Sequence, residues 1–189
     1  RLKDMRSESR PEMVTLQKIW SPVSQNTDIV LNGEKAVTDL HELARTLSET
    51  VPDLQAEYDI VVEGMLRSGS PADQVVVAKQ QSVLAERILR SVNKVLEGGA
   101  DAVTSADAFG RDAAQFGRIL SGMMEGDSAL GIKQVSDPEA LDALEAIAES
   151  FESSVNQSAN AILETSPELF QVREAADGIF RNSPDMLNA

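Results

Sequence analysis

The chain has 189 residues, a formal net charge of −14, no cysteine and one histidine. The missing thiols exclude disulfide bridges and thiolate metal sites, and a lone histidine, His41, excludes multi-histidine metal sites and argues against a histidine-based triad. The acidic charge and the 4% aromatic content disfavour nucleic acid and anionic membrane surfaces as partners. The residues indicate no cofactor and no metal.

Apolar residues recur at steps of three and four along the chain, which is helical spacing, and no stretch alternates as a strand does. Prolines that follow capping residues mark helix starts, as in Asp137-Pro138-Glu139. We therefore predict six helices, over residues 11–50, 53–67, 71–97, 102–125, 138–165 and 167–182. Only Pro22 lies inside an apolar repeat, where we expect a kink or a helix restart. Gly98-Gly99 ends the third helix, and residues 126–136 form the longest loop.

The apolar positions form narrow seams, which are typical of helical bundles and coiled coils. The seam of the fifth helix is expected at Leu141, Leu144, Ala148, Phe151, Val155 and Ile162. The first helix, of some forty residues, would be about 60 Å long. The predicted fold class is therefore all-α, an elongated rod of tandem helical-bundle modules, with one four-helix bundle plus helices of a second.

A helical unit is duplicated along the chain. Glu49-Thr50-Val51-Pro52-Asp53-Leu54 recurs as Glu164-Thr165-Ser166-Pro167-Glu168-Leu169. Two predicted helices precede the second copy, whereas nothing precedes the first. We therefore expect residues 1–70 to be a partial first module, a long helix plus a short one, and residues 71–189 to be a second module that forms a four-helix bundle.

The third helix carries a polar patch that we take as a candidate contact for a ligand or a partner. Gln81, Arg87 and Arg90 lie in it, and the two arginines, three residues apart, share one helix face. Their guanidinium groups suit carboxylates or small oxyanions. The alternative is a solvated face on which Glu86 and Arg90 form an ordinary ion pair.

Phe109-Gly110-Arg111 recurs one heptad later as Phe116-Gly117-Arg118. The glycines each cost about 1 kcal/mol inside a helix, so we expect a close helix approach to offset them. Phe109 and Phe116 either pack in the core or line a groove for a partner.

Other residues carry weaker signals. Ser128 lies in a stretch that partly matches a nucleophile elbow, but no strand precedes it. His41 is expected to be a packed or surface residue. Trp20 and Tyr58 are expected to lie in the bundle core with their polar edges in contact with water.

Four runs of sequence resemble the PilJ-type sensor region of the methyl-accepting chemotaxis transducers of type IV pili. They are residues 40–52, 84–92, 109–113 and 165–176. The sensor helix of this family reads roughly Gln-Arg-x-Leu-Ser-Gln-Arg-Ile, and residues 81–88 match it. The second arginine is kept as Arg87, whereas Ser82 replaces the first. Related nitrate-sensing kinases bind their anion with an arginine of that helix, so Ser82 argues against nitrate-type recognition here.

The resemblance implies a periplasmic sensor domain of a bacterial inner-membrane transducer that controls twitching motility. Transmembrane helices would flank the chain, and the intact receptor would be a homodimer. A pilus protein such as a pilin subunit would provide the signal, and a chemotaxis-type kinase would receive it through a cytoplasmic part outside this chain. The expected function is not enzymatic: helices shift and carry a signal across the membrane. The alternatives are a purely structural or adaptor bundle, and a hydrolase built on Ser128.

Overall fold

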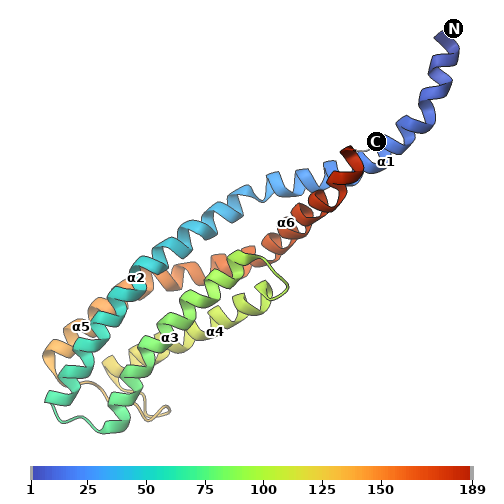
Figure 1. The fold of residues 1–189 in the computed structure, drawn as a ribbon. Coiled ribbons are helices and arrows are strands. Elements are labelled where there is room, and N and C mark those ends of the chain that lie inside the picture. The colour runs from blue at the N-terminus through green and yellow to red at the C-terminus, as the bar shows by residue number, and fades with distance from the viewer. Residues whose placement is uncertain (1, 188–189) are drawn as a thin grey trace.

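The computed structural model describes residues 2–187, and it confirms the all-α prediction (Figure 1). The elements are α1 (Leu2–Asn32), α2 (Glu34–Arg67), α3 (Ala72–Glu97), α4 (Ala102–Glu125), α5 (Pro138–Ser150), the π-helix η1 (Phe151–Asn156) and α6 (Gln157–Leu187). None of the described residues forms a strand, and Asp127 and Ile132 make one isolated bridge in the loop before α5.

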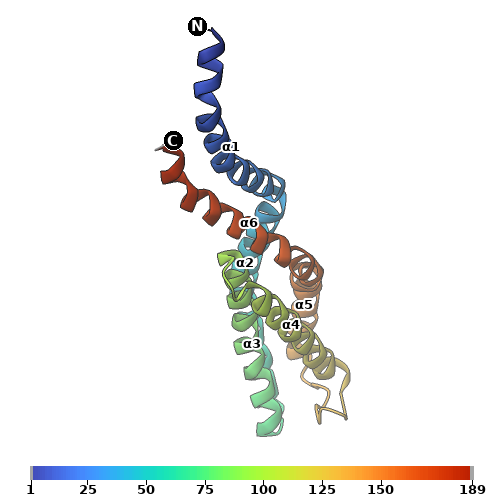
Figure 2. The ribbon, with the colours of Figure 1, turned by 90° about the vertical axis from the view of Figure 1, so that its right-hand side faces the viewer.

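The helices form a four-helix bundle that continues into a two-helix stalk. The bundle consists of α2, α3, α4 and the helix that runs from α5 through η1 into α6. The stalk consists of α1 packed against the C-terminal half of α6, and both ends of the chain lie at its far end (Figures 1 and 2). None of the helices described over residues 2–187 has both the length and the apolar character needed to cross a membrane.

The predicted break at Pro52 is wrong, because α2 runs unbroken from Glu34 to Arg67. The seam explains why: buried positions continue in steps of three and four from Leu40 to Met65 and cross the proline without a change of register. Pro52 is exposed. The carbonyl that it leaves without an N–H partner therefore lies where water can reach it.

The predicted helix 11–50 is divided at Gly33, between α1 and α2. Gly33 is buried, and a Cβ at this position would overlap Cγ2 of Val172 on α6. The absence of a side chain therefore lets the two helices approach closely where the stalk joins the bundle. Helix α1 runs without interruption through Pro22, so the restart alternative is wrong, and α1 bends along its length (Figure 2).

The predicted break at residues 165–167 is also wrong, because α6 continues through Pro167 and Pro184. The irregularity lies earlier, in the π-helix η1. Before η1 the buried residues are Ala140, Ala143, Leu144 and Ile147, so Leu144 of the expected seam is confirmed, whereas the expected Leu141 and Ala148 are only half-buried. The buried stripe of α5 is thus rotated toward Ala140 and Ile147.

The predicted helix ends at Gly98 and Asp137 are confirmed. Gly98 ends α3 in the left-handed conformation, with φ +64°, which glycine adopts without strain. The Asp137 carboxylate accepts a hydrogen bond from the backbone N–H of Ala140 (3.1 Å) and so caps α5, with Pro138 at its first position.

One continuous core joins all four helices of the bundle. Its largest fully buried side chains include Tyr58 on α2, Ile88 on α3, Phe116 on α4 and Ile147 on α5. The core therefore includes residues on both sides of residue 70, and the division into modules 1–70 and 71–189 stays a prediction about repeat units. The core position predicted for Tyr58 is confirmed, but its expected solvated edge is wrong, because Tyr58 is 1% exposed. The prediction for Trp20 is wrong: its side chain lies on the stalk and is 55% exposed.

Candidate functional site

A polar side chain lies at the centre of the bundle. Gln81 is fully buried, and its Nε2 donates hydrogen bonds to the backbone carbonyl of Phe116 (3.0 Å) and to the hydroxyl of Tyr58 (3.3 Å). Its Oε1 has no hydrogen-bond partner among the described residues. A buried acceptor without a partner costs about 1–3 kcal/mol, so this site retains a polar group at the expense of stability.

Aromatic rings surround this glutamine. Tyr58 meets Phe116 edge to face, with ring centroids 5.8 Å apart, and Phe116 stacks on Phe151 at 4.8 Å. Burial raises the pKa of the Tyr58 hydroxyl well above its usual value. The cluster therefore joins α2, α3 and α4 to the first residue of η1.

Gly117 lets Phe151 approach α4. A Cβ at Gly117 would lie 3.1 Å from the Phe151 ring, closer than ordinary van der Waals contact. This agrees with the close helix approach expected for the Phe-Gly-Arg repeat. Phe109 and Phe116 are both fully buried, as the core-packing alternative expects, and a role for them in binding stays a prediction.

The two candidate arginines of α3 have different surroundings. Arg87 donates a hydrogen bond to Asp112 on α4 (2.7 Å), whose side chain is 7% exposed. Arg90 is exposed, and no described carboxylate forms an ion pair with it. The alternative in which Glu86 pairs with Arg90 is wrong, because Glu86 accepts a hydrogen bond from Gln55 of α2 (3.0 Å).

A small cleft opens between α3 and α4 beside these residues. It has a volume of about 210 Å³ and is lined by Gln80, Gln81, Val83, Leu84, Arg87, Gln115 and Ile119. Ligand pockets usually measure about 300–1,000 Å³, so this cleft fits at most a small group. The structure thus brings Gln81 and Arg87 together at one opening, whereas Phe109 and Arg90 do not line it.

Ser128 lies in an exposed turn that follows helix α4. Asp127 forms this turn, because its carboxylate accepts hydrogen bonds from the backbone N–H groups of Leu130 (3.0 Å) and Ala129 (2.8 Å). These bonds, first that from Leu130, lower the pKa of Asp127. The strand that precedes the serine in a nucleophile elbow is thus replaced by a helix, so Ser128 does not lie in a nucleophile elbow.

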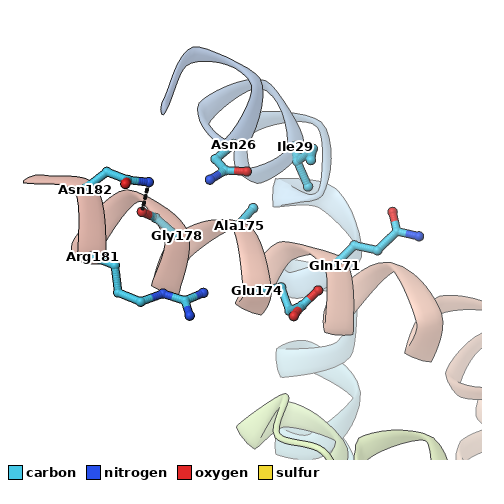
Figure 3. A pocket seen from close by; sticks show the side chains of 8 residues that line it. All are labelled: Asn26, Ile29, Gln171, Glu174, Ala175, Gly178, Arg181 and Asn182. Carbon is cyan, nitrogen blue, oxygen red and sulfur yellow. Dashed lines mark hydrogen bonds between the residues drawn. The ribbon is translucent and has the colours of Figure 1, made fainter. Parts of the chain in front are cut away.

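A wider groove of about 550 Å³ runs along the stalk between α1 and α6 (Figure 3). Its lining combines polar and apolar surface in equal measure, and its polar residues include Asn26 of α1 with Gln171, Glu174 and Arg181 of α6. A Cβ on Gly178 would overlap Nδ2 of Asn26, so the two helices are in close contact at this level. Sequence analysis did not find this groove, because it depends on how two distant segments pair.

The sequence contains a signal for η1 that the helix prediction did not use. The fully buried positions Ala140, Ile147, Val155 and Ile162 are separated by seven, eight and seven residues. A heptad seam with one eight-residue step contains an extra residue, and a π-helical turn accommodates such an insertion.

Comparison with known proteins found two similar proteins, and no family model matches the chain. The chain is 58% identical over 180 residues to a protein of Alcanivorax borkumensis described as methyl-accepting chemotaxis AlkN. It is 53% identical over 179 residues to protein PilJ of Pseudomonas aeruginosa. Each match covers 95% of this chain, which spans only 27% and 26% of the length of these relatives.

Proposed function

We propose, from its similarity over 95% of its length to PilJ and AlkN, that the chain is a PilJ-type region that senses a signal for a chemotaxis-like transducer of type IV pili. In this proposal it is a periplasmic, non-enzymatic domain of an inner-membrane protein. The output controls twitching motility, through a chemotaxis-type kinase that is reached by parts of the protein outside this chain.

The arrangement of the helices supports transmission along the long axis. The bundle lies at one end of the molecule, and α1 and α6 lead away from it side by side, with the N-terminal part of α1 extending beyond the C-terminal end of α6 (Figures 1 and 2). A signal that moves the bundle helices relative to each other therefore enters the stalk through two helices. A shift of one or two ångströms between packed helices is a known form of signalling.

The observation that carries the proposal is the π-helix η1, which lies inside the bundle, upstream of the point where Val172 meets Gly33 and the stalk begins. η1 holds one residue more than an α-helical seam needs, and Phe151, its first residue, packs against Phe116 in the bundle. If the extra residue moves along the helix or is absorbed, the segment upstream of it changes register against its neighbours while α6 stays in place. Two packings of similar free energy then exist, which a signal can bias.

The proposed input is a pilus protein, such as a pilin subunit, that contacts the exposed surface of the bundle. The cleft beside Gln81 and Arg87 is where a contact could reach the buried polar cluster, because both residues line it. Its small volume favours a protruding side chain over a separate metabolite.

A photo-crosslinking amino acid in the intact transducer tests this input. The crosslinker is placed at Gln115, which lines the cleft and is exposed, and the control position is the exposed Glu145 of α5. We expect a pilus protein attached at position 115 during surface contact and little at position 145. Equal yields at the two positions, or no pilus protein at either, would contradict the proposal.

The second candidate is a structural or adaptor bundle without a sensory role. It is supported by the fully buried Phe109 and Phe116, which are ordinary core residues. The two functions differ in one result: a folded, stable variant that abolishes the twitching response is expected only for a sensor.

A further inference from the structure

The outward side of α3 carries a line of exposed side chains that is apolar at one end and basic at the other. Val76 and Val83 are 50% and 57% exposed, and Lys79, Arg90 and Lys94 are exposed as well. At about 100° per residue, the steps of seven from Val76 to Val83 and on to Arg90 return to the same side of the helix. We call these five residues, Val76, Lys79, Val83, Arg90 and Lys94, the α3 outer face. It extends over about 27 Å of the helix axis.

The three cations of the α3 outer face have no partner among the described carboxylates. None of the ion pairs within the described part of the chain includes Lys79, Arg90 or Lys94. The nearby carboxylate of Glu86 accepts a hydrogen bond from Gln55 of α2 instead (3.0 Å). These positive charges are therefore available to carboxylates from outside the chain.

Helix α3 is the basic helix of an otherwise acidic bundle. It holds four basic and three acidic residues, whereas α2 holds three and eight, α4 holds two and three, and α5 holds none and four. Of these four helices, only α3 has a net positive charge. An acidic partner is therefore attracted to α3 and repelled by α2 and α5.

We propose that the α3 outer face binds an acidic amphipathic helix of a partner protein. Apolar side chains of this helix lie against Val76 and Val83, and its carboxylates pair with Arg90 and Lys94. A helix is the fitting shape, because its side chains at steps of three and four match the spacing of the α3 outer face. This deepens the proposed function, on which it rests, because Val83 also lines the cleft assigned to the pilus protein.

Other occupants fit this face less well. A twofold contact between two parallel α3 helices would place Arg90 and Lys94 beside their own counterparts, and like charges in contact are unfavourable. A nucleic acid or another flexible polyanion would extend over the acidic helix α2, which packs beside α3 and repels phosphates. An acidic helix with apolar residues complements both halves of the face.

The contact is expected to be weak and sensitive to salt. One face of a single helix buries less than about 1,200 Å² in total, which is the size of a transient interface. Screening shortens the reach of exposed charges from about 10 Å at 0.1 M salt to about 3 Å at 1 M. Binding should therefore weaken about tenfold or more over this range of salt concentration.

The test uses the chain and two synthetic helical peptides of about 20 residues, which match the length of the face. One carries leucine and glutamate at the matching positions, and in the other lysine replaces each glutamate. Arg90→Glu/Lys94→Glu should weaken binding of the glutamate peptide about tenfold or more and create binding of the lysine peptide. The matched control is Lys35→Glu/Arg45→Glu, which makes the same change of charge at exposed positions of α2. Circular dichroism should be the same for all variants.

A second substitution tests the apolar half of the face. Val83→Ser should weaken the glutamate peptide about threefold or more, because it removes apolar contact area. Val103→Ser, at a position of α4 that is 47% exposed, should not. The proposal is overturned if both charge reversals have the same effect, if the lysine peptide does not bind the Arg90→Glu/Lys94→Glu variant, or if heparin binds the chain more tightly than the glutamate peptide does.

The intact transducer separates this proposal from the proposed function. Capture of a pilus protein at position 115 with the same yield in the parent and in Arg90→Glu/Lys94→Glu would support the proposed input and overturn the role of the α3 outer face. If the peptides behave as expected but no pilus protein is captured at position 115, the proposed input alone is refuted.

Discussion

The ring of Phe151 stacks on that of Phe116, with centroids 4.8 Å apart and planes at 23°. The contact joins the first residue of η1 to the centre of the bundle, where Gln81 donates a hydrogen bond to the carbonyl of the same Phe116. The π-helical turn η1 and the buried amide of Gln81 thus both contact Phe116. Movement of either one is expected to displace α4, which carries Phe116.

Deletion of Ser153 tests whether η1 holds a true insertion. Ser153 is exposed within η1, and its loss shortens the eight-residue step between Ile147 and Val155 to seven. The helix can then continue as a regular α-helix without moving α6. We expect a free energy of unfolding within about 1 kcal/mol of the parent, measured by urea denaturation, together with loss of the twitching response in the full receptor.

The matched control is deletion of Glu164, which is exposed in the regular part of α6. Here the seven-residue step from Ile162 to Leu169 becomes six, and every later seam residue turns away from its partner. This deletion should cost more than about 2 kcal/mol. A similar cost for both deletions would show that η1 does not accommodate an extra residue.

The buried amide of Gln81 predicts a non-additive pair of substitutions. Tyr58→Phe removes one of its two partners and should cost about 1 kcal/mol. The double variant Tyr58→Phe/Gln81→Met removes both polar groups, including the unpaired Oε1, and should be as stable as the parent or more stable. Thermal unfolding of the parent, of Tyr58→Phe, of Gln81→Met and of the double variant measures how the two substitutions combine. Losses of stability that simply add in the double variant would contradict the prediction.

Much of the fold could be predicted because the seam is regular. From Leu40 to Met65 the buried positions follow the expected spacing, and Gly98 and Asp137 end and begin helices where the sequence indicates. The helix boundaries that were predicted from the prolines are wrong. Pro52 and Pro167 are exposed within helices, where tertiary packing of the seam outweighs the local cost of a lost hydrogen bond.

The site could be predicted only in part. The pattern selected Gln81 and Arg87, but their partners Tyr58 and Asp112 lie 23 and 25 residues away on other helices. A seam identifies which residues are buried, and it does not identify which polar side chains meet there. Trp20 illustrates the same limit: its residue type suggested a core position, whereas the stalk leaves it exposed.

The ion pair between Arg87 and Asp112 should respond unequally to the loss of each partner. Arg87→Met leaves the almost buried Asp112 carboxylate without its guanidinium, which should cost about 1–3 kcal/mol. Asp112→Asn keeps an oxygen that can accept from the half-exposed Arg87 and should cost less than about 1 kcal/mol. Urea denaturation of both variants measures the difference, and the reverse order would contradict this account.

The junction of stalk and bundle can be tested with a complementary pair. Gly33→Ala places a methyl group against Cγ2 of Val172, and the overlap should cost about 1–3 kcal/mol. Val172→Ala removes that methyl group, so the double variant should regain most of the loss. Gly99→Ala is the control, because nothing lies within 4 Å of a Cβ there. A double variant that is no better than Gly33→Ala would show that the close approach is not the reason for the glycine.

Tyr58 predicts a loss of stability at alkaline pH. Burial raises its pKa in the folded protein above the ordinary value of 10.0 that applies to the unfolded chain. Below pH 10 both states hold the proton, and the stabilisation is fully present. Above pH 10 the unfolded chain releases the proton first, so the free energy of unfolding falls by up to about 1.4 kcal/mol per pH unit.

Since Tyr58 is the one tyrosine of the chain, its near-ultraviolet phenolate absorbance reports this group alone. In the parent it should appear only at a pH well above 10, or together with unfolding, and Tyr58→Phe should lose stability less steeply over the same range. The two proteins differ only in the hydroxyl of residue 58, so the difference between the two slopes isolates the phenol. A phenolate that forms near pH 10 in the folded chain would mean that the hydroxyl is reached by water and that the polar cluster around Gln81 is open.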